Sequence, residues 1–245
     1  MSIAETPIEV LPTHLDLPHT DGKPVDNAYQ PLQSMLLTSS LTPLLDRFHP
    51  DGNYFIGVDT GIYWRRTENP LEGCKAPDWY YVPNVPRLLN GTFRRSYVLW
   101  QEYAHPLIVI EYVSGDGSDE RDVTLGTGKY WVYEHCIQPS YYIIHDSERE
   151  ELSVFERVRN QFQPLPPTSE ARFRIPLMGV DFGIWQGEYQ GYPAAWLRAW
   201  DWNGFIIPTS EELKELEHQL AERERARAEK LAERLRELGV NPDTV

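Results

Sequence analysis

Two acidic side chains lie at the edges of strand-like apolar runs, and a lysine follows them along the chain. The acids are Asp78 in KAPDWYYVP and Glu111 in PLIVIEYVS, and the lysine is Lys129 in GTGKYWVYEHC. Two carboxylates on adjacent strands can share a divalent metal ion through their oxygen atoms, and a nearby ammonium group can stabilise the charge of a reacting phosphate. The three residues therefore predict metal-dependent cleavage of a phosphodiester.

The predicted metal is Mg²⁺, with Mn²⁺ as an alternative. Oxygen ligands suit both ions, and neither the histidines nor the two cysteines, Cys74 and Cys136, have the spacing of a zinc site. In this hypothesis Asp78 and Glu111 bind the ion, and Lys129 orients the attacking water or neutralises charge. Asp59, in GVDTG, is a candidate supporting acid, although a role in a turn explains it better.

Each of these residues also has a purely structural interpretation. Asp78 could cap a turn, and Lys129 could be a solvated lysine on a helix face. Glu111 is harder to explain in this way, because it lies within LIVIEYV, an apolar run typical of a central strand buried on both faces. A carboxylate buried there is costly unless it is paired or binds a metal, although a structural salt bridge would also suffice.

The composition predicts a folded body with one main domain and a tail. The chain has 245 residues, of which 41% are hydrophobic and 12% aromatic. Its 23 Lys and Arg against 37 Asp and Glu give a net charge of -14, which counts against tight nonspecific binding to DNA. The local charge around the two acidic motifs can differ from this total, because Arg65, Arg66, Arg87, Arg94 and Arg95 cluster there, although pairing of surface arginines with the many acids explains each of them better.

The sequence predicts a soluble, cytoplasmic protein without a membrane segment. The N-terminus lacks the basic and apolar regions of a signal peptide, and no apolar stretch is long enough to span a bilayer. Two cysteines are too few for a disulfide framework.

The predicted organisation is an extended arm over residues 1–30, a domain over 31–208 and a charged helical tail over 209–245. Within the domain, Pro43 is expected to kink or split the first helix. The other patterns predict a helix over 31–48, a bent strand or hairpin over 53–64, strands over 79–82, 107–113 and 141–146, a helix over 127–137, and an edge strand of a hairpin over 152–158.

The order of these elements predicts an α/β fold, of the α+β type with a mixed sheet. Strand 107–113, the following helix and strand 141–146 form a right-handed crossover unit, which makes these two strands parallel. The aromatic segments that follow residue 172 are expected to cover the sheet.

The tail is expected to form one helix of about 28 residues, roughly 40 Å long, capped by Ser210 and ending at Gly239. Its leucines keep heptad spacing in two blocks separated by an eleven-residue step, namely Leu213, Leu216 and Leu220, then Leu231, Leu235 and Leu238. This pattern favours a stuttered coiled coil and a homodimer, whereas a single solvated helix held by ion pairs is the alternative.

The succession of PDWYYV, PLIVIEYVS and GKYWVYEHCIQPSYYIIHD resembles the Uma-two family of restriction endonucleases, a branch of the PD-(D/E)-x-K nuclease superfamily. The resemblance covers roughly residues 20 to 205. It implies a restriction-endonuclease-like core, Mg²⁺-dependent hydrolysis of DNA, and catalytic roles for Asp78, Glu111 and Lys129.

One position departs from the superfamily pattern. The superfamily lysine normally lies two positions after the second acid, where this chain has Val113. In the Uma-two pattern a lysine on the following helix takes this role, and Lys129 is the matching residue. Tyr133, one turn beyond it, matches the helical tyrosine of the family and could support the lysine or simply pack.

Two other functions remain open from the sequence. The first is a catalytically inactive protein of the nuclease fold that binds nucleic acid or a protein partner, favoured by the acidic charge and by Val113. The second is a glycoside hydrolase with Asp78 and Glu111 as acid and base, which would need a sugar cleft. Phosphate-loop, dinucleotide-binding and serine-hydrolase motifs do not occur in the sequence.

Overall fold

The computed structural model of the protein describes residues 11–20, 22 and 27–238. Its main sheet has six strands. Strands β6 and β7 are parallel, and all other neighbours in this sheet are antiparallel. In spatial order the strands are β1 (Tyr54–Val58), β4 (Trp79–Pro83), β6 (Ile108–Tyr112), β7 (Tyr141–Asp146), β8 (Glu151–Val158) and β9 (Gln161–Pro164). The prediction of an α/β fold with a mixed sheet is therefore confirmed.

Two three-stranded sheets accompany the main sheet. One has the order β3-β2-β5, and the other has the order β10-β11-β12. Their bounds are β2 (Ile62–Tyr63), β3 (Cys74–Lys75), β5 (Tyr97–Val98), β10 (Phe173–Ile175), β11 (Val180–Tyr189) and β12 (Tyr192–Asp201). The helical elements are α1 (Tyr29–Phe48), α2 (Leu99–Glu102), α3 (Lys129–Val132), α4 (Ser210–Glu237), the 3-10 turns η1 (Pro70–Gly73) and η3 (Pro176–Met178), and the π-helical turn η2 (Tyr133–Ile137).

Strand β6 and the segment after it form the crossover that the sequence predicts. All five residues of β6 are buried, as expected for an apolar strand between two covered faces. Helix α3 continues directly into η2, and the segment ends at Gln138, whose backbone is left-handed just before Pro139. The crossover then enters β7 parallel to β6.

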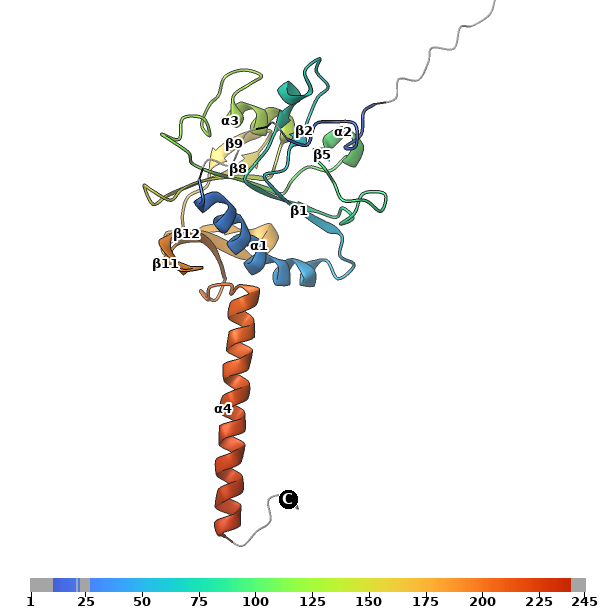
Figure 1. The fold of residues 1–245 in the computed structure, drawn as a ribbon. Helices are drawn as coiled ribbons and strands as arrows, with labels where there is room; N and C mark the ends of the chain where they lie inside the picture. The colour runs from blue at the N-terminus through green and yellow to red at the C-terminus, as the bar shows by residue number, and fades with distance from the viewer. Residues whose placement is uncertain (1–10, 21, 23–26, 239–245) are drawn as a thin grey trace, which may run out of the picture.

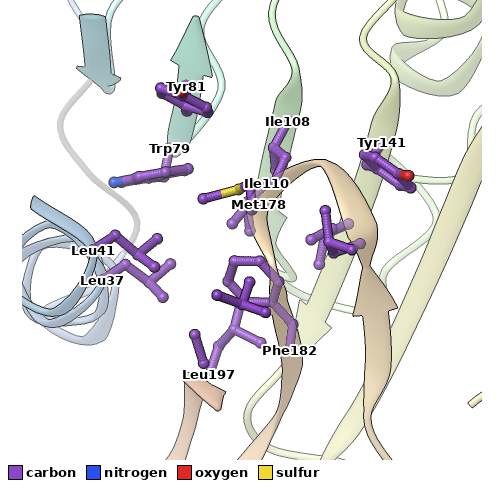
Figure 2. Close-up of a cluster of buried hydrophobic side chains, with 14 of the residues drawn as sticks. Leu37, Leu41, Trp79, Tyr81, Ile108, Ile110, Tyr141, Met178, Phe182 and Leu197 are labelled. Atoms are coloured by element: carbon purple, nitrogen blue, oxygen red, sulfur yellow. The ribbon is translucent and has the colours of Figure 1, made fainter. Parts of the chain in front are cut away.

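Side chains that alternate along the strands bury two opposite faces of the main sheet. On one face, Trp79 and Ile110 meet Leu41 of α1 together with Phe182 and Leu197 of the β10-β11-β12 sheet (Figure 2). This aromatic sheet is the covering layer that the sequence predicts.

The opposite face packs against the crossover. Tyr80 and Val109 point to this side and contact Val132, Tyr133 and the neighbouring apolar residues of α3 and η2. Any residue one position away from Ile110 on β6 therefore faces the crossover helix.

Three local predictions need correction. The segment 53–64, predicted to be a bent strand or a hairpin, is not a hairpin, because β1 joins the main sheet through β4 whereas β2 pairs with β3 and β5. Strand β8 forms the expected hairpin, with β7, but it is not at the edge, since β9 pairs with its outer side. The N-cap of α4 is Thr209 rather than Ser210, and its side chain forms a capping box with Glu212.

Helix α1 is continuous over its 20 residues despite Pro43. A proline has no N–H to donate to the carbonyl four residues earlier, which here belongs to Ser39. The Ser210 hydroxyl at the start of α4 donates to this carbonyl at 3.3 Å. The contact between the two helices thus supplies a donor that the proline removes.

Helix α4 is attached to the body through its first turn and then projects away from it (Figure 1). Arg198 of β12 is almost fully buried and binds the Glu212 carboxylate through Nη2 at 2.8 Å. Beyond this first turn the leucines at positions 216, 220, 231 and 238 are 50–66% exposed. Gly239, where the tail helix was expected to end, lies outside the described residues.

The described part of the N-terminal arm packs on the β3-β2-β5 sheet. Leu17 is buried against Tyr63 and Val98, and the Trp100 indole donates to the carbonyl of Pro12 at 2.9 Å. Residues 1–10, 21 and 23–26 of this predicted arm lie outside the described part of the chain. Within the part that is described, no helix has the length and apolar character needed to cross a bilayer.

Candidate active site

The register of the main sheet brings the two acids together. Trp79 of β4 lies opposite Ile110 of β6, so the next position along this antiparallel pair places Asp78 opposite Glu111. Residues paired in this way have Cβ atoms about 5 Å apart and point to the same face. That face is the one covered by the crossover helix, so the acid pair lies beneath α3.

A backbone hydrogen bond holds the Asp78 carboxylate at the end of its strand. Its Oδ2 accepts from the amide N–H of Tyr112 at 2.6 Å, at the position where β4 no longer provides a ladder partner for β6. The Asp78 carbonyl accepts from the Asp59 amide at 3.3 Å and from the Ser34 hydroxyl at 3.2 Å. The residue is thus fixed by β1, β6 and α1 together.

Glu111 is 2% exposed and has a donor on each carboxylate oxygen. The Lys129 ammonium lies 3.1 Å from Oε2, and the Tyr133 hydroxyl donates to Oε1. Lys129 and Tyr133 lie one turn apart where α3 passes into η2, so both side chains reach back to the strand. Tyr133 therefore contacts the acid rather than the lysine.

The Lys129 ammonium is surrounded by three carboxylates. Besides Glu111, it contacts Asp119 at 3.0 Å and Glu120 at 3.4 Å, both from the loop before α3. The lysine side chain is 21% exposed and that of Asp119 is 65% exposed, whereas Glu120 is fully buried. The network is therefore open to solvent on the side of Asp119.

The loop acids and one further lysine are the parts of this network that the sequence does not reveal. Asp119 and Glu120 lie in GDGSDERD, a polar segment with no sign that one of its acids is buried. Lys75 of β3 lies within electrostatic reach of Asp119, Lys129 and Glu111, and burial lowers its pKa. The position of Lys75, three residues before Asp78, is the sequence signal that could have indicated its place in this network.

Burial and mutual repulsion control the protonation of the acid pair. Burial, reinforced by the nearby charge of Glu111, raises the pKa of Asp78 to about 8. Burial alone would lower the pKa of Lys129, but the charges of Glu111 and its neighbours outweigh it and raise this pKa. Burial also raises the pKa of Tyr133, which keeps its hydroxyl protonated as a donor.

Asp59 lies on the other side of Asp78 from Glu111. Val58 is opposite Trp79, so Asp59 falls opposite Asp78, and its charge adds to the repulsion that raises the pKa of Asp78. Its backbone is left-handed, with φ of 46°, as in a turn. Asp59 therefore has the turn conformation expected from the sequence and also lies beside the acid pair.

Comparison with protein families identifies the group to which this arrangement belongs. The Uma2 family model, described as "Putative restriction endonuclease", matches residues 23–186, which is more than half of the chain. The chain belongs to the Uma2 family. A search of the curated proteins gave no match.

A solved structure is also similar to this chain. It is described as a "putative nuclease belonging to DUF820 from Anabaena variabilis ATCC 29413", and the match covers 65% of this chain and 81% of that one. The sequence identity is 14% and the TM-score is 0.43.

The three residues singled out by the Uma2 resemblance meet at one place in this structure. Asp78 and Glu111 come from neighbouring strands, and Lys129 comes from the crossover helix that covers them. A hollow of about 580 Å³ lies elsewhere, between the β7–β8 turn and the β11–β12 hairpin, and is lined by residues such as Ser147, Gln186 and Ala195. The chemistry of the acid pair, rather than the size of this hollow, makes it the candidate site.

Proposed function

We propose that this Uma2 protein is an endonuclease that hydrolyses phosphodiester bonds of DNA with the help of Mg²⁺. The observation that carries the proposal is the placement of two carboxylates opposite each other on neighbouring strands, with the partly exposed Lys129 ammonium bound to one of them. A family described as restriction endonucleases supports the choice of a nucleic acid as substrate.

The donor groups of the acid pair suit a hard cation. Mg²⁺ is typically held by one or two carboxylates and keeps several waters, and Mn²⁺ accepts similar ligands. In this proposal Asp78 and Glu111 would be the protein ligands. Among the described residues, no group of three or more His, Cys, Asp or Glu is placed to hold a metal. When bound, the ion would supply a Lewis acid for the phosphate and for the attacking water.

The remaining side chains position this pair and carry charge. The Tyr112 amide and the Tyr133 hydroxyl each hold one carboxylate in place. The charges of Glu111 and its neighbours raise the pKa of Lys129, and its ammonium would stabilise the negative charge that develops on the phosphate during cleavage.

The test is cleavage of supercoiled and linear DNA in the presence of Mg²⁺ or Mn²⁺. We expect Asp78→Asn and Glu111→Gln each to lower the rate by about a hundredfold or more, because each removes a metal ligand. Glu188→Gln, an exposed acid on β11, is the matched control and should leave the rate unchanged. Full activity in both site variants would contradict the mechanism.

An inactive nuclease fold is the alternative that the same experiment addresses. The chain carries a net charge of -14 and has Val113 where the superfamily lysine usually lies. A wild-type protein that neither cleaves DNA nor binds Mg²⁺ or Mn²⁺ in calorimetry would favour a binding role and would end the nuclease proposal.

We also propose that the protein is a homodimer joined through α4. Leu216, Leu220, Leu231 and Leu238 are at least half exposed along this helix. Exposed leucines at heptad spacing are typically buried against a second helix. The residues between the two leucine blocks are charged residues and alanines, which accounts for a coiled coil with an interruption.

A further inference from the structure

Two aromatic rings are the most exposed large hydrophobic side chains in the described part of the chain. Phe93 is 85% exposed and Tyr103 is 84% exposed. Phe93 follows the turn after β4, and Tyr103 ends α2. Neither ring contributes appreciable buried area to the fold.

A buried ion pair holds the two aromatic residues on the same edge of the body. The Arg94 guanidinium binds the Glu102 carboxylate through two bonds, from Nε to Oε1 at 2.7 Å and from Nη2 to Oε2 at 2.9 Å. Their side chains are 0% and 3% exposed. Phe93 and Tyr103 are the chain neighbours of these two partners, so the pair fixes their backbones together while both rings face solvent.

Tyr103 has a backbone conformation that does not favour a tyrosine. It is left-handed, with φ of 54° and ψ of 22°, at the C-terminal end of α2. Glycine is the residue best suited to such a position, because a side chain there strains the backbone. Since the ring is exposed, burial does not offset this strain, and a role outside the fold explains the tyrosine better.

The surrounding segment has a charge opposite to that of the whole chain. Residues 84–105 contain three arginines, Arg87, Arg94 and Arg95, and a single acid, Glu102. The whole chain has a net charge of -14. Aromatic rings beside arginines are the composition of surfaces on which bases stack and along which a phosphate backbone runs.

This segment lies on the same face of the main sheet as the acid pair. Arg94 lies over the Phe55 ring at 4.8 Å and near the Tyr97 ring at 6.0 Å. Phe55 and Tyr97 belong to the apolar cluster beneath the crossover helix, together with Tyr133. Figure 1 shows α2 beside β2 and β5, at the end of the body away from α4.

Strand β4 leads from the acid pair toward this segment. It begins at Trp79, directly after Asp78, and ends at Pro83, and the segment that contains both aromatic rings begins at the next residue. The acid pair and the start of this segment are therefore separated by the length of β4, about 16 Å.

We propose that Phe93 and Tyr103 form a stacking platform for unpaired bases of the nucleic-acid strand that is cut at Asp78 and Glu111. The proposal rests on the proposed nuclease function and adds a preference for single-stranded or locally opened substrate. Arg87 and Arg95, the exposed arginines of the same segment, contact the backbone of that strand.

The test measures binding of a fluorescein-labelled single-stranded oligonucleotide by fluorescence anisotropy. EDTA is present to remove divalent metal ions, so that no cleavage occurs. We expect Phe93→Ala and Tyr103→Gly each to weaken binding about 5- to 150-fold, which corresponds to about 1–3 kcal/mol per stacked base. Phe205→Ala is the matched control for a lost exposed ring, since Phe205 is 72% exposed. It should bind as the wild type does.

A second control separates binding from backbone strain. Gln190 is exposed and also left-handed, with φ of 52°, in the β11–β12 hairpin. We expect Tyr103→Gly and Gln190→Gly both to raise the melting temperature, because glycine relieves the strain at each position. Only Tyr103→Gly should weaken oligonucleotide binding.

Several outcomes would overturn the platform, and they differ from those that would overturn the nuclease. Wild-type affinity in Phe93→Ala and Tyr103→Gly, or no binding of the oligonucleotide by the wild type, would reject the platform even if DNA is cleaved. A change of oligomeric state in these variants with unchanged oligonucleotide binding would assign the rings to a protein contact instead. Ring-dependent binding by a protein that cleaves no DNA would reject the nuclease and leave the platform standing.

Discussion

Glu111 is a buried carboxylate whose stability depends on its two donors. The Lys129 ammonium and the Tyr133 hydroxyl each bind one of its oxygens, and the residue is 2% exposed. Removing one partner of a buried charge pair leaves the other charge uncompensated. The donors thus serve the folded state as well as the proposed chemistry.

Loss of the Lys129 charge is expected to destabilise the protein. Lys129→Met leaves Glu111, Asp119 and Glu120 without their shared cation, and we expect the free energy of unfolding to fall by about 3 kcal/mol. Urea titration measures this change. Lys214→Met, on the solvated helix α4, is the control, and an equal loss in the two variants would show that the ammonium is not held as described.

The pKa of Asp78 predicts how stability depends on pH. It is raised from 3.8 to about 8, so between these values the folded protein binds more protons than the unfolded chain. The contribution of Asp78 to the free energy of unfolding should therefore fall as the pH rises from about 4 to about 8. Urea titrations across this range should show a shallower fall in Asp78→Asn than in the wild type, and equal slopes would contradict the burial of a protonated acid.

At the residue scale the sequence identifies the acids more readily than their surroundings. Asp78 and Glu111 could be selected because each interrupts or borders an apolar strand, and the structure places them opposite each other. Glu120 could not be selected, because its loop is polar throughout and burial of this one acid depends on how the loop folds over Lys129.

At the scale of elements, the loop before α3 must approach its own helix closely. A Cβ added to Gly128 would lie 2.3 Å from the carbonyl oxygen of Asp122, and the Trp131 amide donates to this same carbonyl. Only glycine permits this contact. The tight turn determines where α3 begins and hence where Lys129 projects.

Gly128→Ala should therefore disturb both stability and activity. We expect a loss of about 2 kcal/mol in the free energy of unfolding, because the backbone must move to accept the methyl group, and a lower rate of DNA cleavage. Thr127→Ala, at the exposed neighbouring position, is the control. Denaturant titration and the cleavage assay measure the two effects, and wild-type behaviour of Gly128→Ala in both would contradict the role of this turn.

Elements with a strong periodic pattern could be predicted from the sequence, and elements defined by distant partners could not. The apolar runs of β6 and β7 and the helix between them have the expected places. The hairpin expected over 53–64 is absent from the described structure, because β1 and β2 take partners from different sheets. The Ser39 carbonyl that Pro43 leaves without its helical donor is bound by Ser210, which lies 171 positions away in the sequence.

At the scale of the whole molecule, the exposed leucines of α4 predict the oligomeric state. We expect a dimer by light scattering for the wild type and a monomer for the double variant Leu220→Lys and Leu231→Lys, because charges replace apolar groups in the proposed seam. Arg225→Ala, also on α4, should remain a dimer. A wild-type monomer, or a dimer that survives both lysines, would exclude this interface.

The family and the fold class could be predicted from the whole chain, whereas the surface that meets the substrate could not. The acidic total charge gives no indication of where a nucleic acid would bind. The basic segment around Arg94 becomes recognisable only when its ion pair with Glu102 and its exposed rings are seen together.

The attachment of α4 has a mechanical consequence. Its first turn is joined to Ser39 of α1, and Ser34 of the same helix binds the carbonyl of Asp78 and the hydroxyl of Tyr112. These two serines are separated by about 7.5 Å of helical rise. A sideways force on α4 would therefore be transmitted to the backbone of Asp78 through less than two turns of α1.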